Sequence, residues 1–105
     1  MNFMEKHTVW LGKAICALTP SHKRFNDGYR GAIAVVCSLA PNISCAVEQI
    51  CTEFLQLDLA VIGFEYIENQ AYIEREPSEY EAELIAKLES YPVQFADVHI
   101  FKPDA

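Results

Sequence analysis

Short motifs that mark catalytic or cofactor sites are missing from this chain of 105 residues. It has no Walker A sequence and no G-x-G-x-x-G, G-x-S-x-G or H-E-x-x-H pattern. Its four glycines are scattered, so they cannot form a glycine-rich phosphate loop. No stretch sets oxygen ligands around a central glycine as a calcium loop does. The sequence therefore predicts no cofactor and favours a protein that is not an enzyme.

Positive charge and long apolar runs are also scarce. The chain has eight lysines and arginines but fifteen aspartates and glutamates, so its formal charge is −7. Because lysine and arginine carry the affinity for phosphate groups, this balance speaks against nucleic acid and against an anionic membrane surface as partners. No run approaches the roughly 20 apolar residues of a membrane helix, and Lys13 interrupts the N-terminal apolar segment, unlike a signal peptide. We expect one domain, residues 1–105, in the cytoplasm.

The cysteines do not have the spacing of a metal site. Cys16, Cys37, Cys45 and Cys51 form no C-x-x-C pair, and each lies in an apolar context. Buried reduced thiols have this pattern, whereas zinc sites and disulfide frameworks do not. We therefore expect free thiols and no bound metal.

The pattern of apolar residues predicts five strands and two helices. Strands are expected at residues 8–18, 32–39, 59–68, 71–75 and 93–102, the third and fourth forming a hairpin. One helix is expected from Asn42 or Ser44 to Leu57, with one of the first two as N-cap. A second starts with the capping box Ser78-Glu79-Tyr80-Glu81 and stops before Pro92.

The order of these elements indicates a fold class. From residue 32 onward it is strand, helix, strand, strand, helix, strand, which is the split β-α-β arrangement of ferredoxin-like folds. The sequence thus predicts an α+β domain with an antiparallel sheet, both helices on one face and the 8–18 strand added in front. The strands are apolar on both faces, so the face without helices would be an interface, here for a homodimer. The alternative is that the loop at residues 21–30 or the N-terminus covers that face.

Charge changes sign along the chain. Residues 1–31 hold five basic and two acidic residues, a balance of +3, while residues 32–105 hold three basic and thirteen acidic residues, a balance of −10. In the basic part, His22, Lys23, Arg24 and Arg30 are candidates to bind an anion. The alternative is a solvated loop, or one that pairs with the acidic part.

The acidic part of the chain also carries tyrosines, which are common anchors in protein interfaces. Its candidates for contact with a partner lie in the predicted hairpin and second helix, and they are Glu65, Tyr66, Glu68, Tyr72, Glu74, Glu76, Glu79, Tyr80 and Glu83. The alternative is a solvated acidic face. Glutamates in the first turn of a helix are also favoured by the helix dipole alone.

A third interpretation is that the protein is an enzyme that uses Cys45 or His99. Cys45 lies at a predicted helix N-terminus, where the helix dipole favours a thiolate. Asp97 and His99 would share one face of the last strand, so the carboxylate could orient the imidazole. The alternative is a buried cysteine at a helix start and a histidine at the rim of the sheet.

A small acidic chain without catalytic motifs resembles the bacterial immunity proteins that neutralise toxin nucleases. The resemblance is one of composition, without a shared motif. It implies a non-enzymatic inhibitor that binds a basic protein through the acidic residues, because complementary charge steers association. The alternative is a homodimeric ferredoxin-like domain that binds or senses a small ligand.

Overall fold

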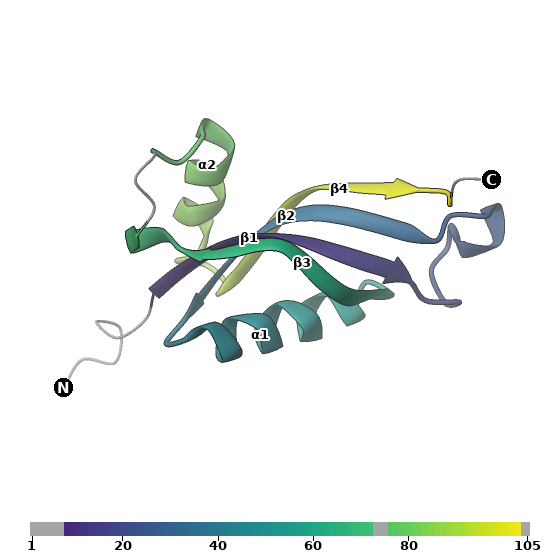
Figure 1. Ribbon diagram of the computed structural model, residues 1–105, viewed down its shortest axis with the longest axis horizontal. Coiled ribbons are helices and arrows are strands. Elements are labelled where there is room, and N and C mark those ends of the chain that lie inside the picture. Colours follow the sequence, from purple (N-terminus) through teal and green to yellow (C-terminus); the bar gives the residue numbers. More distant parts are fainter. Residues whose placement is uncertain (1–7, 73–75, 104–105) are drawn as a thin grey trace.

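The structure, a computed structural model, describes residues 8–72 and 76–103 apart from the side chain of Asp97. These residues form an elongated α+β fold of 50 × 27 × 21 Å (Figure 1). The elements are β1 (Thr8–Leu18), β2 (Gly31–Ala40), α1 (Ile43–Leu55), β3 (Leu59–Asn69), α2 (Glu79–Lys87) and β4 (Val93–Phe101), with short 3-10 helices η2 (Phe25–Asp27) and η3 (Gln70–Tyr72). No helix in the described ranges is long and apolar enough to cross a membrane.

The strands form one antiparallel sheet, in which the described residues follow the order β3-β1-β2-β4. β1 and β2 make a long hairpin at the centre, paired from Thr8 opposite Ala40 to Ala17 opposite Gly31. Both are apolar on both faces, as expected for strands that are covered from two sides. The antiparallel sheet and the strands predicted near residues 8–18, 32–39, 59–68 and 93–102 are therefore confirmed.

The predicted place of the N-terminal strand is wrong. β1 is not an addition in front of a ferredoxin-like sheet but lies between β2 and β3. It occupies the position that the predicted strand at residues 71–75 would have taken, and Ala71 and Tyr72 lie instead in η3. Residues 73–75 are outside the described ranges. The physical reason is length and sequence order, because the 11 residues of β1 offer a longer ladder than a five-residue strand and β2 is the next strand along the chain.

The main core lies between the sheet and α1. Asn42 caps this helix, accepting a hydrogen bond from the backbone N–H of Cys45 at 2.9 Å. Ile50 and Phe54 of α1 are fully buried against small residues of the central strands, such as Ala34. The ring of Phe54 meets Phe95 of β4 edge-on, with centroids 5.0 Å apart. The helix predicted from Asn42 or Ser44 to Leu57 is therefore confirmed, with Asn42 as its N-cap, and its buried face lies at the centre of the fold.

α2 packs on the opposite face of the sheet, so the prediction that both helices share one face is wrong. Figure 1 shows α1 and α2 on opposite sides of the strands. Leu84 and Leu88 of α2 are buried against Leu11 of β1 and Cys37 of β2, which point away from α1. The apolar residues on this face of β1 and β2 attract the helix there, because α1 already fills the other face. The predicted capping box of Ser78 and Glu81 is confirmed.

α2 covers only one end of its face. Farther along the strands, Ile15 and Ile33 are half-buried side chains in cross-strand contact on this face. The ring of Phe101 lies over Gly31, where a Cβ would clash with it, and is itself 36% exposed. The loop at residues 21–30 does not cover this area, because Phe25 and Tyr29 pack against the core on the α1 side. The predicted apolar character of this face is confirmed. Residues 1–7, the other predicted cover, lie outside the described ranges. We call the area that the described residues leave uncovered the open sheet area.

Candidate functional site

The acidic candidates on β3 lie toward the side of the sheet that carries α2. Glu68 is paired with Leu11, and Leu11 points into the α2 cluster. Tyr66 is paired with Lys13 on the same face. Glu65 is exposed beside an irregularity in the ladder, and its carboxylate lies 3.2 Å from the Lys13 ammonium. Tyr72, in η3 just beyond the strand, is 83% exposed.

α2 adds its outer face to this region. Glu79, Tyr80 and Glu83 are exposed and line a shallow hollow of about 350 Å³. Glu76, before the helix, is exposed as well, whereas Glu74 lies outside the described residues. We refer to the exposed members as the acidic surface, which comprises Glu65, Glu68, Tyr72, Glu76, Glu79, Tyr80 and Glu83. The structure thus gathers most of the predicted contact residues around α2 and the end of β3.

Several carboxylates of the acidic surface form no ion pair with another described residue. Lys13–Glu65 and Arg24–Asp27 are ion pairs within the described ranges. Neither of them involves Glu68, Glu79 or Glu83. Exposed ion pairs contribute little to stability, so even Glu65 remains available to another cation. The acidic surface therefore presents a negative potential to an approaching partner.

The two arginines among the predicted anion-binding residues make contacts within their own loop. Arg24 stacks 4.5 Å from the centre of the Tyr29 ring and donates to Asp27 at 3.0 Å. Arg30 stacks 3.8 Å from the Phe25 ring and donates to the carbonyls of Phe25 and Tyr29. The backbone N–H of Arg24 donates to Nδ1 of His22, while Lys23 is exposed. Both guanidinium groups thus hold the loop together, and anion binding by these four residues stays a prediction.

The structure does not bring Cys45 and His99 together, so the interpretation of these residues as a catalytic pair is wrong. Cys45 lies in the first turn of α1, while His99 is paired with Ile33 and lines a hollow on the opposite face of the sheet. The side chain of Asp97 lies outside the described structure. The sheet separates the thiol from the imidazole.

The four cysteines are free thiols, as expected. Burial raises the pKa of Cys16 to about 11 and that of Cys37 to about 12. Burial also raises the pKa of Cys51. Thiols with raised pKa values stay protonated at neutral pH and are poor nucleophiles. Within the described ranges, no group of three or more metal-ligating side chains gathers in one place.

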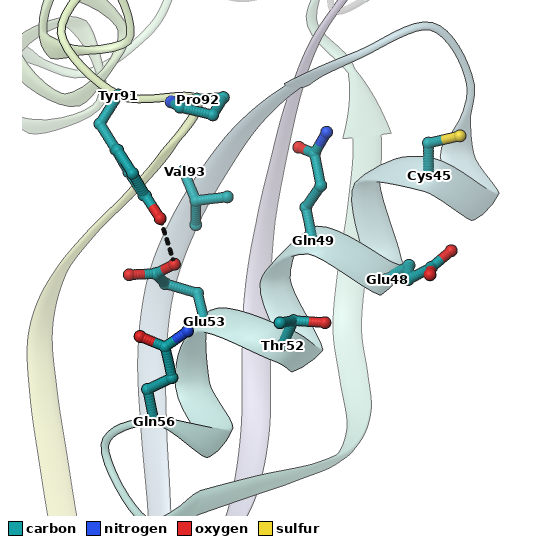
Figure 2. Close-up of a pocket in the computed structure, with 9 residues that line it drawn as sticks. All are labelled: Cys45, Glu48, Gln49, Thr52, Glu53, Gln56, Tyr91, Pro92 and Val93. Carbon is teal, nitrogen blue, oxygen red and sulfur yellow. Dashed lines mark hydrogen bonds between the residues drawn. The ribbon is translucent and has the colours of Figure 1, made fainter.

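The α1 side of the molecule has a groove that the sequence does not predict. It has a volume of about 380 Å³ and lies between the polar face of α1 and the segment that leads into β4 (Figure 2). The Tyr91 hydroxyl donates to the Glu53 carboxylate at 2.7 Å across its mouth, and this bond and the charge of Glu53 raise the pKa of Tyr91. The polar residues on one face of α1, which form one wall, can be recognised in the sequence. The contact between Glu53 and Tyr91 cannot, because no pattern of neighbouring residues indicates it.

Comparisons of this chain with protein-family models, with curated protein sequences and with solved structures found no match. Its function therefore has to be inferred from its own surfaces. Three are available: the acidic surface around α2, the open sheet area and the groove beside α1.

Proposed function

We propose that this protein is a non-enzymatic binding module that recognises a basic protein, in the manner of small cytoplasmic inhibitors that neutralise toxin nucleases. The observation that carries the proposal is the acidic surface, with Glu68, Glu79 and Glu83 unpaired among the described residues. Complementary charge of this kind accelerates encounter with a cationic partner and excludes anionic ones. The free thiols are in keeping with a reducing compartment.

The acidic surface also has a fixed frame and aromatic contact area. Leu84 and Leu88 hold α2 on the sheet, so its glutamates keep their positions relative to β3. Tyr72 is 83% and Tyr80 39% exposed. Tyrosines at the centre of an interface supply large contact areas at low entropic cost, and flanking charges add specificity. A partner would therefore contact α2, η3 and the end of β3 together.

The proposal is tested by capture from native lysate on the immobilised protein, compared between two variants of equal charge. Glu79→Gln/Glu83→Gln alters the acidic surface, and Asp27→Asn/Asp58→Asn removes the same charge from the loops at the far end of the sheet. We expect a basic protein to be retained by the wild type and the loop variant, lost by the α2 variant and released by salt. A captured nuclease should lose activity in stoichiometric mixture with this protein. Equal retention by both variants, or no basic protein retained, would refute the proposal.

The second candidate function is a homodimer that binds or senses a small ligand. The observation in its favour is the open sheet area, with Ile15 and Ile33 half-buried and Phe101 at its edge. A hollow of about 300 Å³ there, lined in part by Lys13 and His99, could hold a small ligand. Light scattering should then give twice the chain mass of 11.9 kDa. Phe101→Asp, at an exposed strand end, should return the monomer, and a wild type that is monomeric at all concentrations would contradict this candidate.

A further inference from the structure

The groove beside α1 has the size and walls of a site for one small group. Its volume of about 380 Å³ falls within the usual range for small-molecule pockets. One wall consists of α1 side chains that share a helical face, namely Cys45, Glu48, Gln49, Thr52, Glu53 and Gln56. The opposite wall is formed by Tyr91, Pro92 and Val93 (Figure 2).

The hydrogen-bonding groups of the groove favour a cationic donor as the ligand. Glu48 and Glu53 bring two carboxylates, and no lysine, arginine or histidine is among the lining residues. The main donor near Glu53, the Tyr91 hydroxyl, is already used in the bond to that carboxylate. Gln49 is held by the fully buried Ser38 hydroxyl, which donates to its side-chain oxygen at 2.6 Å. Several acceptor positions on the two carboxylates remain open.

The position of Glu53 in the helix points the same way. It lies in the last turn of α1, where the helix dipole is negative and a cation is normally favoured. The last turn of α1 has no basic residue. The Glu53 carboxylate is therefore placed against like charge, and its partner within the molecule is the neutral Tyr91 hydroxyl. A bound cation would relieve both the dipole and the carboxylate.

The Tyr91 ring favours one kind of cation over others. Tyr91 is 48% exposed, and its ring lies beside the Glu53 carboxylate, to which its hydroxyl is bonded (Figure 2). A planar guanidinium can stack on an aromatic face while it donates two parallel hydrogen bonds to a carboxylate, which an ammonium group cannot do. We propose that this groove is a binding site for an alkylguanidinium group, held by Glu53 and stacked on Tyr91. The group would belong to a free small molecule or to an arginine side chain.

The site is independent of the acidic surface, because the two lie on opposite faces of the sheet, and its test uses small probes only. Arginine amide is titrated into the ¹⁵N-labelled protein while amide shifts are followed, with lysine amide as the comparison cation and a Gly-Arg-Gly amide peptide for the side-chain source. We expect shifts confined to Gln49, Thr52, Glu53 and Gln56, and binding of arginine amide about tenfold tighter than that of lysine amide. Equal binding of both probes would overturn the guanidinium assignment. Tighter binding of the peptide would indicate a protein ligand, and equal binding a free one.

Three variants separate a binding role from a structural one. Glu53→Gln should weaken arginine amide about tenfold, and Tyr91→Leu should weaken it several-fold while leaving the fold intact. Asp27→Asn, which removes the same charge from a loop outside both proposed sites, should leave binding unchanged. In the wild type the phenol of Tyr91 should titrate at lower pH when arginine amide is bound, since the cation offsets the charge of Glu53. No shift at saturating probe, or an equal loss in Asp27→Asn, would refute the site.

Discussion

The docking of α2 depends on very few side chains, so Leu84→Ala should release this helix. α2 has nine residues, and isolated helices of this length are marginal in water. Its capping box fixes its first turn, but the helix is held to the sheet chiefly by Leu84 and Leu88. Leu84 is 3% exposed and contacts the cluster of Leu11 and Cys37. Truncating it removes a large part of that attachment.

The cost follows from the burial of the side chain. A buried Leu→Ala change costs about 2–5 kcal/mol, and the shallow position of α2 at the end of the sheet favours the lower half of this range. A loss of about 3 kcal/mol corresponds to an opening equilibrium about a hundredfold more favourable. Because the core beneath α1 does not involve Leu84, we expect this opening to be local to α2.

Amide hydrogen exchange distinguishes local from global opening. In Leu84→Ala, the amides of α2 should exchange about a hundredfold faster, while Val36 in β2 keeps its protection. Leu55→Ala is the matched control, since it makes the same truncation in α1 at a side chain that is 57% exposed. It should change exchange little anywhere. Unchanged exchange in α2, or equal acceleration in α2 and β2, would show that this account of α2 is wrong.

Phe54→Ala should lower the free energy of unfolding by about 3–5 kcal/mol in urea titrations, because the ring is fully buried against Phe95; a loss below about 1 kcal/mol would contradict the α1 core. Burial raises the pKa of Cys37 to about 12, so above about pH 9 the unfolded chain loses a proton that the folded chain keeps. The free energy of unfolding should therefore fall as the pH rises from about 9 toward 12, and Cys37→Ala should reduce this dependence on pH. Iodoacetamide should alkylate the half-buried Cys45 before Cys37 in the native protein, and mass spectrometry that finds the reverse order would refute this ranking. Asp58 follows α1 with φ 61°, so Asp58→Gly should raise the melting temperature, by the equivalent of about 0.5–1 kcal/mol, while an unchanged value would show that aspartate is not strained there.

Features encoded by neighbouring residues could be predicted from the sequence. The strand expected at residues 8–18 coincides with β1, because alternating apolar residues end at Thr19-Pro20. The capping box of Ser78 and Glu81 has its predicted hydrogen bonds. The second helix ends at Lys87, earlier than predicted, and the Gln94 side chain donates to the carbonyl of Lys87 there. Gln94 lies beyond the predicted end of this helix, so its hydrogen bond to the last residue of α2 could not be predicted from the local sequence.

Choices between distant partners could not be predicted in the same way. The alternation in β1 shows two apolar faces but does not say that β3 will pair with it rather than with a strand at residues 71–75. The same two faces leave open which of them α2 will cover. The separation of Cys45 from His99 follows from that arrangement. So does the groove, since the Tyr91–Glu53 hydrogen bond joins residues 38 apart in the sequence.

The lengths of the helices explain why the open sheet area exists. Nine residues of α2 extend for roughly 14 Å, whereas the ten residues of β2 extend for roughly 33 Å. One such helix cannot cover a face on which apolar residues recur at every second position from Ile33 to Leu39 of β2. α1, with 13 residues and the large side chain of Phe54, covers its own face much more fully. The apolar remainder beside α2 is therefore a consequence of a short second helix.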